Sequence, residues 1–321
     1  MRVLFFGTSA FAVPTLRALH ESAPRHTVLG VVTQPDRPSG RGMRLTASPV
    51  KELALELGYP VYQPEKVRRK PFPEQVRELN PDVLVVVSFG QIIPQKLLDM
   101  PRFGGINVHA SLLPRWRGAA PIHHAIAAGD AETGVATMQM EATLDTGPVF
   151  LVAKEPIRPD DTTGSLEPRL AERGGPLLVR TLDEREAGTL TSTPQPEEGM
   201  VYAPPAEKPF GYLDPVADSA VALERRIRAA QPRPGAFLVV GGKTLKVLEA
   251  RLADDTEDTA PGTVAAVRKN GIVIGTTEGG LLLTRIQPES RGAMDAAAYA
   301  RGARLEPGAP AHSPAPEPNA P

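Results

Sequence analysis

The chain has 321 residues, of which 41% are hydrophobic, and its 36 basic and 37 acidic residues almost cancel. This composition excludes a disordered polyelectrolyte and any partner that is held by bulk charge alone. The absence of cysteine excludes disulfide bonds, thiolate metal sites and a cysteine nucleophile. The six histidines are therefore the first candidates for side-chain acid–base chemistry near neutral pH.

The N-terminal segment is apolar enough to suggest a secretory signal. Only Arg2 supplies a positive charge, however, and Gly7-Thr8-Ser9 interrupts the apolar run. No apolar run in the sequence reaches the roughly 18 residues that a membrane-spanning helix needs. We therefore interpret the segment as a strand, a turn and a helix, and we expect a cytoplasmic protein with no membrane partner.

The first half of the chain alternates short apolar runs with helical patterns, as repeated β-α-β units do. The predicted strands are Val3–Phe6, Val28–Thr33, Val83–Val87 and Ile106–Val108. The predicted helices are Phe11–His20, Pro49–Leu57, Pro73–Leu79 and Pro94–Met100, with another beginning near Pro121. This alternation predicts an α/β fold with a doubly wound parallel sheet, whose ligands lie at the carboxyl ends of the strands.

The second half of the chain differs in composition and in the spacing of its predicted elements. Residues 190–207 are rich in proline and are predicted to form an extended linker between residues 1–189 and residues 208–305. A helix is predicted at Ala220–Ala230, followed by strands at Ala236–Val240, Thr244–Leu248, Thr263–Val267, Gly271–Ile274 and Leu281–Ile286. Five closely spaced strands predict a small β-barrel, for which the oligonucleotide-binding (OB) barrel is one candidate. Residues 306–321 are predicted to be a disordered Pro/Ala-rich tail.

Several common active-site fingerprints are absent. Only Gly7 of the dinucleotide-binding glycine pattern follows the first strand, which argues against a nucleotide-dependent oxidoreductase. The Walker, HExxH and G-x-S-x-G patterns do not occur. His123 and His124 are adjacent in the chain, so they cannot share one helix face as a metal pair, and no metal site is predicted.

Polar side chains gather where the strand at Ile106–Val108 ends. Asn107 and His109 are two residues apart and therefore project from the same face of that strand. An amide can stabilise the oxyanion of acyl transfer, and an imidazole can carry a proton near neutral pH. Asp145, in a predicted loop, could orient the imidazole. The same three residues are also compatible with a turn cap, a core histidine and an ordinary turn residue.

The run from Asn107 to Ile122, together with Leu144-Asp145-Thr146-Gly147, resembles the signature of the 10-formyltetrahydrofolate-dependent formyltransferases. Three further segments agree with it: Phe6–Ser9, Ser88–Pro94 and Gly129–Val135. Gln34–Gly42, Val201–Ala203 and Ile227–Pro232 resemble in particular those members that formylate methionyl-tRNA. The chain departs from the family pattern at Phe89, at Asp214-Pro215 and at Pro232-Arg233-Pro234.

The resemblance implies a catalytic trio of Asn107, His109 and Asp145. It implies a folate site that is lined by Phe89, Gly90, Gln91, Ile92, Ser111, Leu112, Leu113 and Pro114. It also implies a Rossmann-like formyltransferase domain, 10-formyltetrahydrofolate as co-substrate without a metal, and a barrel-like C-terminal domain that helps to hold the tRNA. A monomer is the expected state.

Binding of tRNA should appear as local positive charge. Arg37, Arg41 and Arg44 lie in the Gly-rich loop from Gln34 to Ser48, and Arg225 and Arg228 lie at the end of the helix before the barrel. We predict that these arginines bind the tRNA, although a solvated surface would have the same composition. The alternative keeps the chemistry and changes the acceptor to glycinamide ribonucleotide, an amino sugar or water. A nucleic-acid-binding module with an inactive first half is a further alternative.

Overall fold

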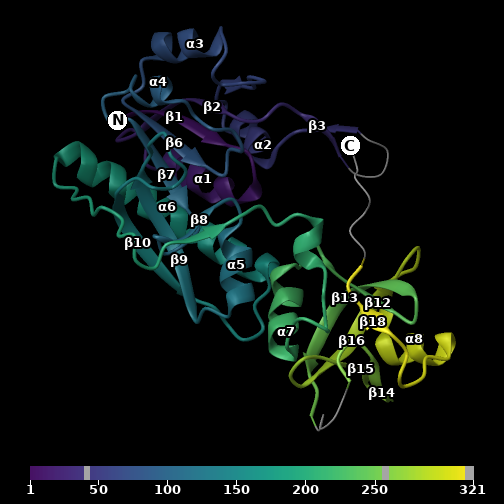
Figure 1. Cartoon of the computed structure of the whole chain (residues 1–321). Helices are drawn as coiled ribbons and strands as arrows, with labels where there is room; N and C mark the ends of the chain where they lie inside the picture. The colour runs from purple at the N-terminus through teal and green to yellow at the C-terminus, as the bar shows by residue number, and fades with distance from the viewer. Residues whose placement is uncertain (40–43, 255–259, 315–321) are drawn as a thin grey trace. The chain divides into compact units, whose positions relative to one another are not determined.

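A computed structural model describes residues 1–39, 44–254 and 260–314 (Figure 1). The chain divides into two compact units. Unit 1 comprises Met1–Pro121, Glu132–Pro156 and Glu167–Ala203, and unit 2 comprises Ile122–Ala131, Ile157–Leu166 and Pro204–Pro321. The change from one unit to the other after Ala203 falls inside the predicted linker.

Unit 1 is built on a seven-stranded sheet with the order β10-β9-β7-β6-β1-β2-β5. Its parallel strands are β1 (Arg2–Gly7), β2 (Thr27–Val32), β5 (Val61–Tyr62), β6 (Val83–Val87) and β7 (Gly105–His109). The predicted parallel Rossmann-like sheet is therefore confirmed. Two strands that were not predicted, β9 (Glu132–Gln139) and β10 (Val149–Pro156), extend it beyond β7: β9 pairs antiparallel with β7, and β10 pairs antiparallel with β9.

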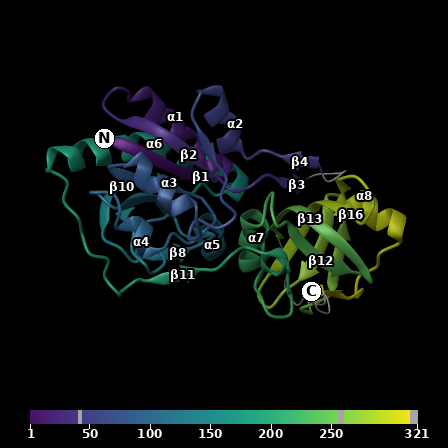
Figure 2. The same ribbon diagram turned by 90° about the horizontal axis from the view of Figure 1, so that it is seen from above.

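Helices connect and cover these strands, and the predicted helices are present within a few residues of their expected ends. They are η1 (Ala10–Ala12), α1 (Val13–Glu21), α2 (Pro49–Glu56), α3 (Phe72–Leu79), α4 (Gln95–Leu98) and α5 (Pro121–Ala128). The long helix α6 (Thr163–Ala187) was not predicted, because Pro168 and Pro176 lie inside it. A Cβ on Gly175 would approach Ala18 to 2.8 Å, so the glycine allows α6 to pack closely on α1 (Figure 2).

Two small pairs of strands add to unit 1. β3 (Arg37–Ser39) and β4 (Arg44–Thr46) form an antiparallel pair within the predicted basic loop. β8 (Arg115–Gly118) pairs in parallel with β11 (Val201–Ala203). The predicted linker therefore contributes a strand to unit 1.

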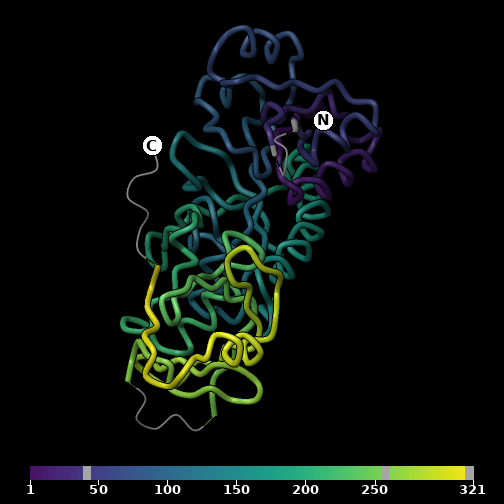
Figure 3. Tube along the Cα trace, turned by 90° about the vertical axis from the view of Figure 1, so that its right-hand side faces the viewer, coloured from purple at the N-terminus to yellow at the C-terminus, as the bar shows by residue number. Residues whose placement is uncertain are grey.

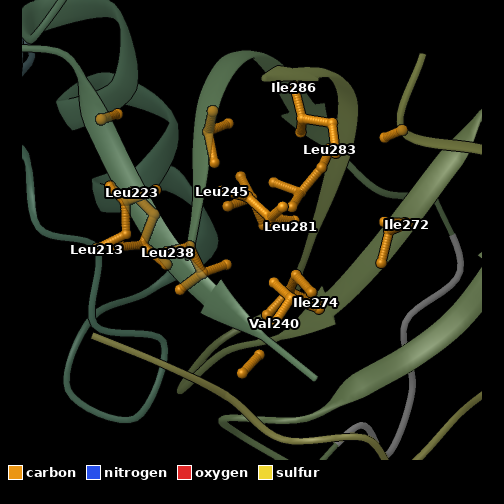
Figure 4. Close-up of a cluster of buried hydrophobic side chains, with 14 of the residues drawn as sticks. Leu213, Leu223, Leu238, Val240, Leu245, Ile272, Ile274, Leu281, Leu283 and Ile286 are labelled. Atoms are coloured by element: carbon orange, nitrogen blue, oxygen red, sulfur yellow. The ribbon is translucent and has the colours of Figure 1, made fainter. Parts of the chain in front are cut away.

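Unit 2 contains a curled antiparallel sheet with the order β14-β15-β16-β13-β12-β18, which confirms the barrel-like prediction (Figure 3). The elements are η2 (Lys208–Gly211), α7 (Ala220–Ala229), β12 (Ala236–Val240), β13 (Lys243–Leu252), β14 (Val264–Arg268), β15 (Gly271–Gly275), β16 (Gly280–Pro288), β17 (Met294–Asp295), α8 (Ala296–Ala303) and β18 (Ala311–His312). Alternate residues of the strands, such as Leu238 and Val240, point into one core with Leu223 of α7 (Figure 4).

The predicted disorder after Glu306 is wrong for residues 306–314. Ala311 is fully buried, and β18 pairs with β12 through Val240 and Val239. Proline-rich composition does not prevent order here, because the two residues of β18 find backbone partners on the edge of an existing sheet. Residues 315–321 lie outside the described part of the chain.

Candidate active site

The site begins where the strand order of the sheet reverses, between β1 and β6. A Cβ on Gly7 would lie 2.8 Å from Phe5 and 2.9 Å from Ala12, so glycine is required for the turn out of β1. The next residue, Thr8, donates from its backbone N to the Ser88 carbonyl at 3.2 Å and from its hydroxyl to the Phe89 carbonyl at 2.8 Å. These bonds hold together the carboxyl ends of the two strands, where an α/β sheet binds its ligands.

The predicted folate residues after β6 fall into two groups. The Phe89 ring is buried and packs edge-on against Phe6 with the ring centroids 5.3 Å apart, so only its backbone remains at the edge of the sheet. Gln91 donates to the Pro64 carbonyl and accepts from the Val67 backbone N. Gly90 and Ile92, by contrast, are exposed, and Ile92 retains 83% of its accessible surface. An apolar side chain this exposed is available to a ligand.

The predicted folate residues after β7 form a compact turn. Ser111 is buried and donates from its hydroxyl to the Arg115 carbonyl at 2.7 Å. Leu112, Leu113 and Pro114 are half-buried between that turn and the surface. Ser111 therefore shapes the turn, and the three following residues are those that a ligand could touch.

The structure brings Asn107, His109 and Asp145 together. Asn107 and His109 are at the carboxyl end of β7, two residues apart, so both project from one face of the strand. The Asn107 Nδ2 group donates to Asp145 Oδ1 at 3.2 Å, and His109 Nδ1 lies 3.7 Å from Asp145 Oδ2. The side chains of His109 and Asp145 retain only 6% and 10% of their accessible surface. Water screens such buried groups weakly, which strengthens the interaction of a carboxylate with an imidazolium.

The second nitrogen of the imidazole is held by a residue that sequence reasoning missed. Trp116 has a φ of 64°, in the left-handed region, and its carbonyl oxygen lies 2.9 Å from His109 Nε2. A carbonyl can only accept, so Nε2 carries a proton in this contact. With a carboxylate facing the other nitrogen, the doubly protonated ring can satisfy both neighbours. No pattern in the sequence distinguishes Trp116 for this role, because the contact with His109 is made by its backbone carbonyl and not by its side chain.

Several contacts fix the conformation of the loop that carries Asp145. Asp145 itself has a φ of 54°, and its Oδ2 accepts from the Gly118 backbone N at 2.9 Å. A Cβ on Gly147 would overlap the carbonyl oxygen of Gln139, so only glycine fits there. Gln195, which sequence reasoning also missed, donates to the backbone of this loop. The arrangement offers an amide donor, an imidazole and a carboxylate to one reacting centre, which suits acyl transfer to an amine.

Two of the three predicted tRNA-binding arginines of unit 1, Arg37 and Arg44, belong to the β3–β4 pair. Arg37 is exposed at the start of β3, the backbone of Arg44 begins β4, and Arg41 lies outside the described residues. Nearby, Asp36 accepts from Lys51 Nζ at 2.6 Å and from Gln63 Nε2 at 2.8 Å. These hydrogen bonds lower the pKa of the Asp36 carboxyl. The acidic residue of this loop is therefore already paired with a cation.

The two predicted arginines of unit 2 make contacts within the fold. Arg225 donates to the Ala128 carbonyl at 3.4 Å. The Arg228 guanidinium donates to both carboxylate oxygens of Glu224, at 2.7 and 3.0 Å, and to the Asp161 carbonyl at 2.9 Å. A phosphate would have to compete with these partners for Arg228, so its predicted role in tRNA binding is less well supported than that of Arg37.

Among the described residues, no group of three or more His, Asp or Glu side chains is arranged to hold a metal ion. None of the helices that the structure describes is both long and apolar enough to cross a bilayer.

Comparison with known proteins identifies relatives along nearly the whole chain. A family model described as formyl transferase matches residues 1–182, and one for the formyl transferase C-terminal domain matches residues 208–304. The methionyl-tRNA formyltransferase of Myxococcus xanthus is 50% identical over 307 residues, which are 96% of this chain and 96% of that protein. The methionyl-tRNA formyltransferase of Halorhodospira halophila is 50% identical over 309 residues, which are 96% of this chain and 98% of that protein.

Solved structures share the fold at low sequence identity. The sugar 3N-formyltransferase WlaRD has a TM-score of 0.67 at 15% identity, over 91% of this chain and 99% of that chain. HypX from Aquifex aeolicus, solved with tetrahydrofolic acid, has a TM-score of 0.59 at 20% identity over 94% of this chain, which spans 47% of HypX. The two family models and the relatives at 50% identity lead to one conclusion: the chain belongs to the formyltransferase family.

Proposed function

We propose that this protein transfers the formyl group of 10-formyltetrahydrofolate to the α-amino group of methionyl-tRNA, for the initiation of translation. The amine attacks the formyl carbon, the bond from that carbon to N10 breaks, and N10 receives a proton while the amine loses one. The products are formyl-methionyl-tRNA and tetrahydrofolate. The nucleophile is the substrate's own amine, so the enzyme needs no nucleophile of its own, in keeping with a chain without cysteine.

The observation that carries the chemistry is the grouping of Asn107, His109 and Asp145: the Asn107 amide donates to Asp145 at 3.2 Å, and His109 Nδ1 lies 3.7 Å from the same carboxylate. Among the described residues, the Asn107 amide makes one side-chain hydrogen bond, which leaves its second N–H to stabilise the tetrahedral oxyanion. A protonated His109 stabilises the same negative charge. Asp145 orients His109 and helps to remove the excess proton of the amine, directly or through a water molecule.

The proposed folate site lies at the same edge of the sheet. Exposed Gly90 and Ile92 after β6 and half-buried Leu112, Leu113 and Pro114 after β7 supply its surface. Two further residues, Phe89 and Gln91, supply backbone groups, and Ser111 fixes the turn through its bond to Arg115. The formyl group of the bound co-substrate would then be presented to Asn107 at the end of β7.

Two features support methionyl-tRNA as the acceptor over a small amine. The relatives at 50% identity carry that name and match the chain through both units, including the barrel-like C-terminal domain. The β3–β4 pair presents Arg37 with its acidic neighbour Asp36 already paired to Lys51. Arginine suits a phosphate backbone because its planar fork donates two parallel hydrogen bonds. We propose that residues 1–189 carry the chemistry and residues 208–305 help to hold the tRNA.

A side-by-side transfer assay tests the function. The protein is incubated with 10-formyltetrahydrofolate and, separately, with methionyl-tRNA, free methionine, glycinamide ribonucleotide or an amino sugar. We expect rapid formylation of methionyl-tRNA and little formylation of the small amines. Preferential formylation of a small acceptor would overturn the proposal, as would release of formate into water at the same rate in the absence of any acceptor.

A further inference from the structure

Gln195 lies in the proline-rich segment that separates α6 from β11, and it is the one residue between Thr191 and Met200 that is not exposed. Its side-chain amide makes three hydrogen bonds. Nε2 donates to the carbonyls of Asp145, at 2.9 Å, and Gly147, at 2.7 Å, and Oε1 accepts from Arg117 Nε at 2.9 Å. Both N–H groups and the oxygen of the amide are therefore used.

These three bonds join the two segments that meet at the Asp145 carboxylate. Asp145 and Gly147 form the loop that carries this carboxylate. Arg117 lies in β8, between Trp116, whose carbonyl faces His109, and Gly118, whose backbone N donates to Asp145. A single amide from the linker thus connects both walls of the proposed catalytic centre.

The segment that carries Gln195 is itself anchored on both sides. Before it, Thr193 exchanges two backbone hydrogen bonds with Val149, each 2.8 Å long. After it, Val201 begins the pairing of β11 with β8. Gln195 is therefore presented to the Asp145 loop by fixed backbone, and its position does not depend on a free loop.

The loop needs such support because its own backbone is unusual. Asp145 has a φ of 54°, which costs free energy for a residue other than glycine unless surrounding contacts enforce it. Rotation about that backbone would move the Asp145 carboxylate away from Asn107, His109 and Gly118. The bonds from Gln195 to the Asp145 and Gly147 carbonyls oppose this rotation.

We propose that Gln195 is a positioning residue of the reaction. It holds the Asp145 loop so that the carboxylate keeps its distance and orientation toward Asn107 and His109. The inference rests on the proposed function of that site. It assigns to the linker a role in catalysis that a connector between domains does not have. Gln195 touches none of the reacting atoms, and both of its N–H groups are donated to the Asp145 loop, so we expect its effect to pass through Asp145.

The test compares Gln195→Ala and Gln195→Glu with the wild-type protein, using whichever acceptor the wild-type protein formylates. Because displacements of about 1 Å in a catalytic group can cost on the order of 100-fold, we expect kcat to fall by about 10- to 100-fold. The KM values for the acceptor and the folate should stay near their wild-type values. Gln195→Glu keeps the size of the side chain but loses both N–H donors, so it should be as impaired as Gln195→Ala. Glu198→Ala, an exposed neighbour in the same segment, is the matched control and should behave as wild type.

A double variant separates positioning from a general structural effect. If Gln195 acts through Asp145, Gln195→Ala should cost nothing further in an Asp145→Ala background, because effects of groups that act as a unit do not multiply. Circular dichroism and the midpoint of thermal unfolding establish that each variant is folded. Near-normal kcat in both Gln195 variants, or the same loss in the Asp145→Ala background as in the wild type, would overturn the inference. Failure of the wild-type protein to formylate methionyl-tRNA would instead overturn the proposed function and leave this comparison measurable with another acceptor.

Discussion

The Asn107 side-chain amide donates to Asp145 Oδ1 across 3.2 Å, although the two residues are 38 positions apart in the chain. Asn107 is fixed by the register of β7, where it lies opposite Val86 of β6 and Met138 of β9. Asp145 comes from a loop and is fixed by Gly118 and Gln195. A strand in the middle of a sheet therefore sets the position of the amide, and long-range hydrogen bonds bring the carboxylate to it.

This relationship predicts that the three side chains act as one unit. Asn107→Ala should lower kcat/KM for methionyl-tRNA by on the order of 100- to 1000-fold, the usual cost of losing an oxyanion donor, and His109→Ala and Asp145→Ala should each remove most of the turnover. Losses in double variants should be smaller than the product of the single losses. Steady-state formylation kinetics with circular dichroism as the folding control measure both. A folded His109→Ala variant with near-normal turnover would contradict the assignment.

The close contact of Gly147 with Gln139 predicts a second loss of activity, in a variant that keeps all three catalytic side chains. Gly147→Ala would push a methyl group against the Gln139 carbonyl and move the Asp145 loop. We expect kcat to fall by about 10-fold or more and the free energy of unfolding to fall by about 1–3 kcal/mol, as for an overpacked site. Gly292→Ala is the matched control, because a Cβ there meets nothing within 4 Å. Equal activity of the two variants would mean that the loop does not need this glycine.

The basic loop predicts where specificity for the acceptor resides. Arg41→Ala should lower kcat/KM for methionyl-tRNA by about 10- to 1000-fold, which corresponds to roughly 1.4–4 kcal/mol. The affinity for the folate should hardly change. Loss of a phosphate contact should also make the salt dependence of tRNA binding shallower. Arg68→Ala, which removes an exposed arginine from another part of unit 1, serves as the control. An Arg41→Ala variant that formylates methionyl-tRNA normally across salt concentrations would favour a small acceptor.

One buried and two half-buried histidines predict a loss of stability in mild acid. Burial lowers the pKa of His26, His123 and His124 below the usual value of 6.5. Between 6.5 and the lower pKa of the folded state, the unfolded chain binds more protons than the folded chain. The free energy of unfolding should therefore fall as the pH is lowered through about 6.5, and it should be insensitive to these groups above about 7.5.

Urea denaturation at several pH values between about 5 and 8 measures this dependence. His123→Gln is the informative variant, because glutamine can still donate to the Arg233 carbonyl that His123 Nε2 contacts at 3.1 Å and does not titrate. Its free energy of unfolding should fall less steeply with acid than that of the wild type. An unchanged slope would show that His123 does not contribute to the acid sensitivity.

Much of the central sheet could be predicted because a strand that is buried on both faces is a continuous apolar run. Val83–Val87 was predicted with the bounds that β6 has in the structure, and all five of its residues are buried. The antiparallel strands β9 and β10 and the helix α6 could not be predicted in this way. In α6, packing of Gly174 and Gly175 against neighbouring elements outweighs the cost of two internal prolines, and local propensity does not contain that information.

The same distinction between local pattern and tertiary packing applies to the candidate site. The sequence by itself determines that Asn107 and His109 share one face, because alternate residues of a strand always do. Only the tertiary structure decides that Asp145 meets them, that the Trp116 carbonyl faces His109, and that Gln195 of the linker holds the Asp145 loop. The physical reason is that strand geometry repeats within a few residues, whereas each of these contacts joins groups whose distance depends on the path of the whole chain between them.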